Sequence, residues 1–212
     1  MFLEKLSVGP FQCNCSILAC EESHEAIIID PGEDADRILD IVRSQGLKVK
    51  YLLHTHAHLD HVGATGEVCQ GTKSEVCLHP DDQFLYDNVA MQAALFNLPS
   101  FTVPPINHHL VDGDEFRFGK YKMEVFHTPG HTPGSCSFYL SGEKEPQLFT
   151  GDTLFLGSIG RTDLWGGDYG QILQSIKDKL LPLEDATVVH AGHGPNSSIG
   201  RERKGNPFLK GL

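Results

Sequence analysis

Short runs of hydrophobic residues, broken by glycine, proline and polar turns, predict strands and helices that alternate through the first half of the chain. The predicted strands of this half are Cys15–Cys20, Glu25–Asp30, Val49–Leu53 and Glu75–Leu78. Apolar residues at helical spacing predict one helix that Asp34 caps and Gly46 ends, and a second over Val62–Gly71. A third begins at Pro80. Its expected core contacts are Phe84, Leu85, Val89 and Leu95.

The second half reads mainly as strands. The predicted strands are His109–Val111, Glu115–Phe118, Lys122–His127, Ser135–Leu140, Gln147–Thr150 and Thr187–His190. Residues Pro99–Asn107 are rich in proline and predict an irregular segment, and Tyr169–Leu181 predicts a last helix. This order predicts an α/β fold in which two sheets lie between helices, in one domain over residues 1–212.

Composition is that of a globular protein without a membrane partner. The chain has 212 residues, of which 40% are hydrophobic and 21% are charged. We find no apolar run long enough to span a membrane and no signal peptide, so we expect the cytosol. The net charge of −11 argues against a nucleic-acid partner. The oligomeric state stays open.

The six cysteines contain no Cys-x-x-Cys pair. Cysteine in a reducing compartment is commonly a buried free thiol, and we favour that interpretation. A redox or metal-binding role is the alternative.

The densest chemical signal is a cluster of imidazoles and one carboxylate directly after the strand Val49–Leu53. His56, His58, Asp60 and His61 place four metal ligands within six residues. Core packing explains this cluster poorly, because buried imidazoles without partners would each cost about 1–3 kcal/mol. Four nearly consecutive side chains cannot wrap one ion, so we expect two neighbouring ions and further ligands from elsewhere.

Three later turns offer such ligands. His131 lies in Thr-Pro-Gly-His-Thr-Pro-Gly, Asp152 follows an apolar strand in Thr-Gly-Asp-Thr-Leu-Phe, and His193 lies in Ala-Gly-His-Gly-Pro. Each signal is weak by itself, since an aspartate after a strand is usually a turn residue. Together with the first cluster they form a strong pattern.

These four motifs resemble the metallo-β-lactamase superfamily over nearly the whole chain. The resemblance implies a four-layer αβ/βα sandwich. It also implies that His56, His58 and His131 hold a first metal ion, that Asp60, His61 and His193 hold a second, and that Asp152 bridges both.

Within the superfamily, the stretches Gly151–Asp163 and Gly200–Phe208 resemble glyoxalase II and its short bacterial relatives, which are expected to lack the C-terminal helical domain. The resemblance implies hydrolysis of S-lactoylglutathione or a related small-molecule thioester by a hydroxide between two divalent ions. Zinc is favoured, and iron and manganese also suit the ligands. Asp60 would orient the hydroxide as the catalytic residue. Candidate substrate contacts are Arg161, Arg201, Arg203 and Lys204.

Two other functions remain open. A persulfide dioxygenase with one iron shares the Gly-Arg-Thr-Asp stretch at 160–163, whereas His193 completes a second metal site that such an enzyme does not need. A non-catalytic metal-binding interaction module is the other alternative.

Several polar residues near these motifs allow two interpretations. His54 is either structural, which we favour, or a partner of a ligand, and Asp30 either orients a ligand or forms the turn with Pro31. The other histidines lack motif support: His79, His108, His109, His127 and His190.

Overall fold

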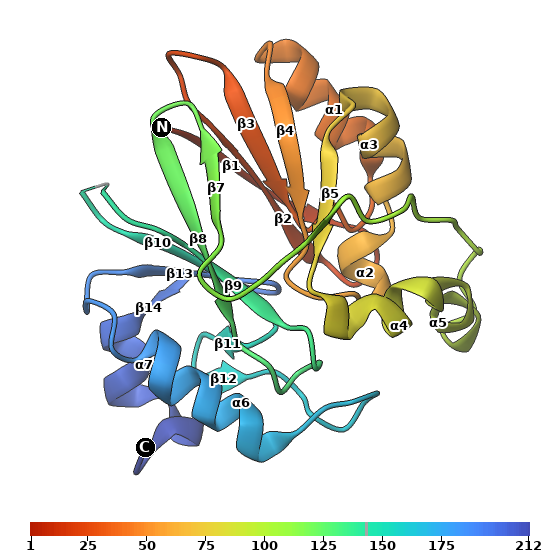
Figure 1. The fold of residues 1–212 in the computed structure, drawn as a ribbon. Helices are drawn as coiled ribbons and strands as arrows, with labels where there is room; N and C mark the ends of the chain where they lie inside the picture. Colours follow the sequence, from red (N-terminus) through yellow and green to blue (C-terminus); the bar gives the residue numbers. More distant parts are fainter. Residues whose placement is uncertain (143) are drawn as a thin grey trace. The chain divides into compact units, whose positions relative to one another are not determined.

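Strands of the N-terminal half form a six-stranded mixed sheet in the computed structural model, which describes residues 1–142 and 144–212 (Figure 1). In spatial order the strands are β1 (Phe2–Val8), β2 (Cys13–Ala19), β3 (Glu25–Ile29), β4 (Lys48–Leu53), β5 (Glu75–Leu78) and β6 (His108–His109). The first two pairs are antiparallel and the next three are parallel. The sequence pattern predicted β2 to β5 but missed β1, most of which is only partly buried.

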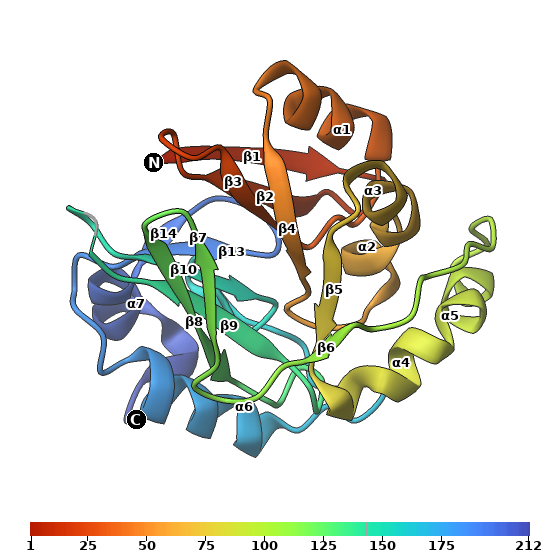
Figure 2. The ribbon, with the colours of Figure 1, turned by 45° about the horizontal axis from the view of Figure 1, so that its top comes forward.

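Helices cover one side of this sheet. They are α1 (Ala35–Ser44), α2 (Leu59–Val62), α3 (Thr65–Thr72), α4 (Gln83–Asp87) and α5 (Val89–Leu95), with the 3₁₀ turn η1 (Pro80–Asp82) before α4. Helices α1 and α3 lie side by side, and α3 packs on β4 and β5 (Figure 2). Gly46 ends α1 with a φ of 60°, as predicted. Asp34 precedes α1, but its side chain makes no capping bond.

Two of the predicted helices are shorter and more broken than the pattern suggested. The predicted Val62–Gly71 helix corresponds to α3, which begins three residues later, and the separate short helix α2 begins directly after His58. The helix predicted from Pro80 is divided at Asn88. Phe84 and Leu95 lie outside the buried face that contains Leu85, Val89 and Gln92 and are 45% and 61% exposed, so the prediction of core contacts was wrong for them. Leu85 and Val89 are buried as expected.

The C-terminal half forms a second six-stranded mixed sheet with its own helices. The sheet order is β14 (Ser197–Ser198), β13 (Val188–Ala191), β10 (Gln147–Gly151), β9 (Cys136–Leu140), β8 (Tyr121–His127) and β7 (Glu115–Phe118), and β11 (Leu154–Phe155) pairs with β12 (Ser158–Ile159). Helical segments are α6 (Tyr169–Ser175), the π-helical η2 (Ile176–Leu180), α7 (Ile199–Gly205) and η3 (Pro207–Leu209). The sequence pattern missed α7.

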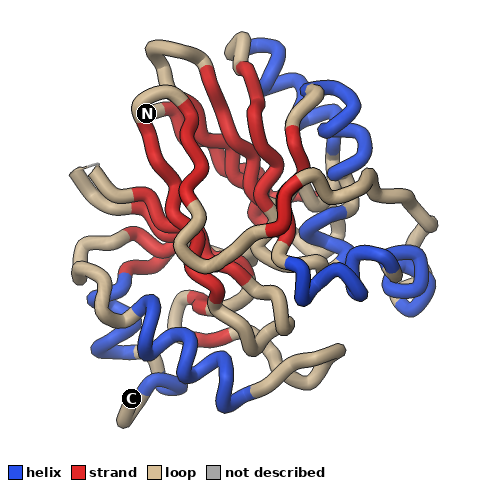
Figure 3. The backbone as a smooth tube through the Cα atoms, in the orientation of Figure 1, coloured by secondary structure: helices blue, strands red, loops and turns tan. Residues whose placement is uncertain are grey.

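An apolar core joins these helices to their sheet. Its buried members include Leu148 and Val189 from β10 and β13, Ile172 and Ile176 from the α6–η2 segment, and Ile199 from α7. Figure 3 shows that in each half of the chain the helices lie against strands of their own sheet. Burial of such side chains contributes about 1.5–3 kcal/mol each, so these contacts hold the strand ends that carry the polar motifs.

By their internal contacts the described residues form two compact units. The first is Met1–Leu110 with Arg117–Tyr121, the tip of the β7–β8 hairpin, and the second is Val111–Phe116 with Lys122–Leu212. One domain over residues 1–212 therefore stays a prediction. Among the described residues, none of the helices has the length and apolar character needed to cross a membrane.

Candidate functional site

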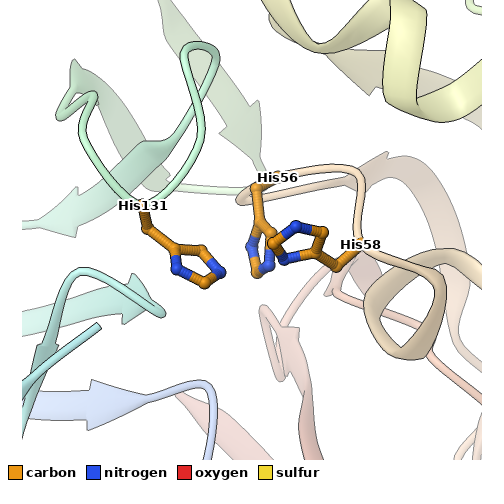
Figure 4. Close-up of side chains that lie close together, drawn as sticks. All are labelled: His56, His58 and His131. Carbon is orange, nitrogen blue, oxygen red and sulfur yellow. The ribbon is translucent and has the colours of Figure 1, made fainter. Parts of the chain in front are cut away.

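The first unit carries four of the predicted ligands on the loop after β4 and on α2. Figure 4 shows His56 and His58 on this loop, with their imidazole rings close together. Their ring centroids are 4.8 Å apart, and the centroids of His56 and His61 are 4.0 Å apart. His58 has extended backbone angles, so alternate side chains of the loop leave the same side. The sequence spacing therefore brings the imidazoles together as predicted.

One buried carboxylate, that of Asp30, organises this loop from the end of β3. It accepts the N–H and the hydroxyl of Thr55, each at 2.7 Å, and it accepts Nδ1–H of His61 at 3.0 Å. The Thr55 hydroxyl in turn lies 3.0 Å from Nδ1 of His56. Because that hydroxyl donates to Asp30, it accepts from His56. This favours a ligand-orienting role for Asp30.

These bonds decide which ring nitrogen of each histidine can bind a metal ion. With Nδ1 protonated and held, His56 and His61 present the lone pair of Nε2. Asp60 stands next to this edge, because its Oδ2 lies 3.7 Å from Nε2 of His61 and its side chain is 18% exposed. The Asp60 carboxylate is therefore the member of this group that solvent and substrate can reach.

The second unit carries the other three predicted ligands. Nε2 of His131 and Nε2 of His193 each lie 3.6 Å from Oδ2 of Asp152. His131, which Figure 4 labels, comes from the β8–β9 loop. Asp152 directly follows β10, and His193 follows β13. The three turns that the sequence singled out thus meet around one carboxylate oxygen.

Backbone contacts fix the positions of these three groups. Nδ1 of His131 donates to the carbonyl of Arg161 at 2.7 Å, which again leaves Nε2 as the ligand atom. Gly160 lies against the Asp152 backbone so closely that a Cβ atom there would sit 1.7 Å from the Asp152 carbonyl oxygen. Only glycine fits at that position. His127 stabilises the turn that carries His131 by donating to the Pro133 carbonyl at 2.9 Å.

The geometry within each unit fits metal binding better than hydrogen bonding. Separations of 3.6–3.7 Å between imidazole nitrogen and carboxylate oxygen are too long for a good hydrogen bond. Two ligands that are each about 2.0–2.2 Å from a tetrahedral ion lie about 3.4 Å apart. Nitrogen and carboxylate donors together suit zinc, iron and manganese. The residues present therefore fit divalent metal ions.

The four predicted substrate contacts differ in how many ion pairs and hydrogen bonds their side chains make with other residues. Arg161 is exposed and makes a two-pronged bond to Asp163, with distances of 2.7 and 2.9 Å. Arg203 binds Asp185 and two carbonyls of the Leu181–Leu183 turn, and Lys204 lies 3.2 Å from Asp185. Arg203 and Lys204 thus already have structural partners, whereas Arg201 is exposed on α7.

The C-terminal stretch Gly200–Phe208 is anchored by a residue that the sequence analysis did not single out. The buried carboxylate of Glu202 accepts from Gly157 N–H and Asn206 Nδ2, both at 2.8 Å, and from the Ser197 hydroxyl. Glu202 therefore ties α7 to the loop that follows Asp152. A lone glutamate on an amphipathic helix gave no signal of this role.

Histidine and cysteine neighbours of the site are structural. His54 donates from Nδ1 to the Cys77 carbonyl at 3.1 Å and accepts from the Thr65 hydroxyl at 2.8 Å, which supports the structural interpretation. All six cysteines are free thiols, as predicted, and five are buried. Cys13 Sγ lies 3.5 Å from Nδ1 of His61, and burial raises the pKa of this thiol to about 12, so it stays neutral.

We expect Asp30→Asn to weaken binding of the metal ion at His61 about 10- to 100-fold, because the amide cannot accept all three hydrogen bonds that the carboxylate accepts. Asparagine tolerates the left-handed backbone of residue 30, where φ is 51°, so the turn itself is preserved. Chelator competition on the purified variant measures the change. Unaltered metal affinity would show that Asp30 is a turn residue only.

Comparisons with known proteins show what the chain is similar to. A model of the metallo-beta-lactamase superfamily matches residues 8–193. The chain is 41% identical to hydroxyacylglutathione hydrolase GloC of Haemophilus influenzae over 99% of this chain and 98% of that one. It is 32% identical to mitochondrial persulfide dioxygenase ETHE1 of Mus musculus, over 91% of this chain and 70% of that one.

Two solved structures superpose closely. The BLEG-1 B3 metallo-beta-lactamase has a TM-score of 0.90 at 40% identity, and covers 99% of this chain and 100% of its own. TTHA1623 in a di-iron-bound form has a TM-score of 0.86 at 37% identity, and covers 97% and 100%.

Proposed function

Because the chain belongs to the metallo-beta-lactamase superfamily and has its fold, we propose that it is a metal-dependent hydrolase that cleaves a thioester of the S-lactoylglutathione type. The observation that carries the proposal is a set of hydrogen bonds to three histidines. They engage Nδ1 of His56, His61 and His131 and leave the Nε2 atom of each ring for metal ions.

The proposed centre uses ligands from both units. His56, His58 and His131 would hold one ion and Asp60, His61 and His193 the other, with Asp152 between the two. The chemistry of the donors supports this division, since each ion receives neutral imidazoles and at least one carboxylate. The di-iron form of TTHA1623 supports a count of two, and we favour zinc over iron and manganese as the resident metal.

When bound, divalent ions supply an ionised water as nucleophile at neutral pH and a Lewis acid for the carbonyl oxygen. Asp60 accepts the hydrogen bond of the attacking water and so directs it at the thioester carbon. Attack of the water oxygen forms the C–O bond, and the C–S bond breaks. The proton that the water lost on ionisation goes to the leaving sulfur. The products are a carboxylic acid and a thiol.

The mouse relative keeps a second candidate function open, which is persulfide oxidation at a single iron. Two observations favour hydrolysis. GloC is the more similar of the two relatives, and the match covers almost the full length of both chains. His193 is placed against Asp152 at ligand distance, as a second metal site requires. We retain the cytosol as the proposed compartment, because the free thiols fit a reducing environment.

A direct assay tests the proposed function. Purified protein should release thiol from S-lactoylglutathione, lose this activity on dialysis against a chelator, and regain it when zinc is returned. Protein that binds zinc but releases no thiol from any thioester would contradict the proposal.

We expect Arg201→Ala to raise KM for S-lactoylglutathione up to about fivefold and to leave kcat nearly unchanged, because an exposed arginine contributes about 0–1 kcal/mol of uniform binding to a substrate carboxylate. Steady-state kinetics with an uncharged thioester controls for folding and should show no change. Lys177→Ala, which removes another exposed cation, should match wild type with both substrates. Equal changes with charged and uncharged substrates would mean that Arg201 is structural.

A further inference from the structure

Two buried polar side chains that follow β5 hold the backbone of the ligand loop. Asp82 Oδ2 accepts the N–H of Ala57 at 3.0 Å. The amide of Gln92 donates to the Ala57 carbonyl at 3.1 Å and accepts the Leu59 N–H at 3.0 Å. Both polar backbone groups of Ala57, the residue between the first two histidine ligands, are thus fixed by side chains from η1 and α5.

The orientation of the Gln92 amide is fully determined by its surroundings. Its Nε2 donates a second time, to the Leu85 carbonyl at 2.8 Å. A flipped amide would put its oxygen against two carbonyl oxygens and its nitrogen against an N–H, so only one orientation satisfies every group. Gln92 is 1% exposed and Asp82 is fully buried, so solvent does not compete for these hydrogen bonds.

The position of Ala57 makes this contact relevant to metal binding. His56 and His58 flank it on an extended loop, and their imidazoles leave the same side. Any rotation of the Ala57 peptide groups therefore changes the distance between the two rings. Asp30 acts on the ring nitrogens, whereas Asp82 and Gln92 act on the backbone that carries the rings.

We infer that Gln92 and Asp82 are positioning residues, which set the separation and direction of the His56 and His58 imidazoles and thereby the metal affinity of the proposed centre. The inference rests on the proposed function, because it assigns metal binding to these two histidines. It adds a part of the chain that has no ligand of its own, the η1–α5 segment, to the determinants of the site.

The test compares Gln92→Leu, which keeps the side-chain volume and removes all three hydrogen bonds, with Gln83→Leu. Gln83 lies on α4, and its side chain donates to Asp87 at 2.8 Å in an exposed setting. We expect zinc to bind Gln92→Leu about tenfold or more weakly in chelator competition. The visible absorption spectrum of the cobalt(II)-loaded variant should also shift, because the ligand geometry differs. Gln83→Leu should match wild type in both measurements.

Both measurements are made at a temperature where circular dichroism shows the variants folded. A lower Tm for Gln92→Leu with wild-type zinc affinity and cobalt spectrum would overturn the inference, since that pattern belongs to a purely structural residue. Wild-type protein that binds no zinc would instead overturn the proposed function, and the inference with it.

A second pair of variants decides the matter if Gln92→Leu does not fold. Asp82→Asn keeps an oxygen that accepts the Ala57 N–H, and we expect its zinc affinity to stay within about threefold of wild type. Asp82→Ala removes the acceptor and should weaken zinc binding about tenfold. Equal affinities for the two variants would contradict a positioning role.

Discussion

Asp152→Ala is expected to lose both metal ions and to lower kcat/KM for thioester hydrolysis at least about a thousandfold. The proposed bridging carboxylate belongs to both ion sites, so its removal takes one anionic ligand from each. Within its own unit Asp152 has two imidazole nitrogens at 3.6 Å from one carboxylate oxygen. Elemental analysis of the purified variant gives the metal count, and the thiol-release assay gives the rate.

Asp178→Ala is the matched control for this variant. Asp178 is an exposed aspartate of the same unit that bonds to Gln174, and its removal should leave the metal count and the rate unchanged. Retention of one tightly bound ion in Asp152→Ala, with much of the activity, would show that the carboxylate serves one ion and does not bridge two.

Asp60→Asn is expected to lower kcat about 100- to 1000-fold at saturating metal concentration and to change KM little. The substitution keeps the shape of the side chain but removes the charge that accepts the hydrogen bond of the attacking water and directs it. Since Asp60 is also a proposed ligand, the rate is measured as a function of added zinc, so that weaker binding is separated from slower chemistry.

Asp36→Asn, an exposed aspartate in the first turn of α1, is the control for charge alone. If excess zinc restored the full rate of Asp60→Asn, Asp60 would be a ligand without a catalytic role. If KM rose and kcat stayed constant, the carboxylate would contribute to substrate binding instead.

Much of the ligand arrangement within each unit could be predicted from the sequence, because local geometry determines it. Histidines at positions 56 and 58 share a side of an extended loop by their spacing. His131, Asp152 and His193 each follow a strand of one sheet, so the ends of β8, β10 and β13 place them together. The α/β class with two sheets between helices was predicted from the order of the elements, and the solved structures confirm the fold.

Contacts between residues distant in sequence could not be predicted. Gln92 on α5 and the Arg161 carbonyl both contact the ligand loops. No motif includes Gln92, and the Gly-Arg-Thr-Asp stretch pointed to the side chain of Arg161 and not to its carbonyl. The exposure of Phe84 and Leu95 was also hidden, because apolar residues lie on both faces of this segment and the hydrophobic pattern does not show which face is buried. Such features follow from tertiary packing and not from local preference.

We propose that two metal ions hydrolyse a thioester without oxidation, and one combined measurement distinguishes this function from a dioxygenase. Metal content of the purified, metal-replete protein is determined, and the same sample is assayed in an oxygen electrode with glutathione persulfide and then for thiol release from S-lactoylglutathione. We expect close to two ions per chain, thioester turnover and no oxygen uptake. One tightly bound iron per chain, with rapid oxygen uptake and no thioester turnover, would contradict it and identify a persulfide dioxygenase.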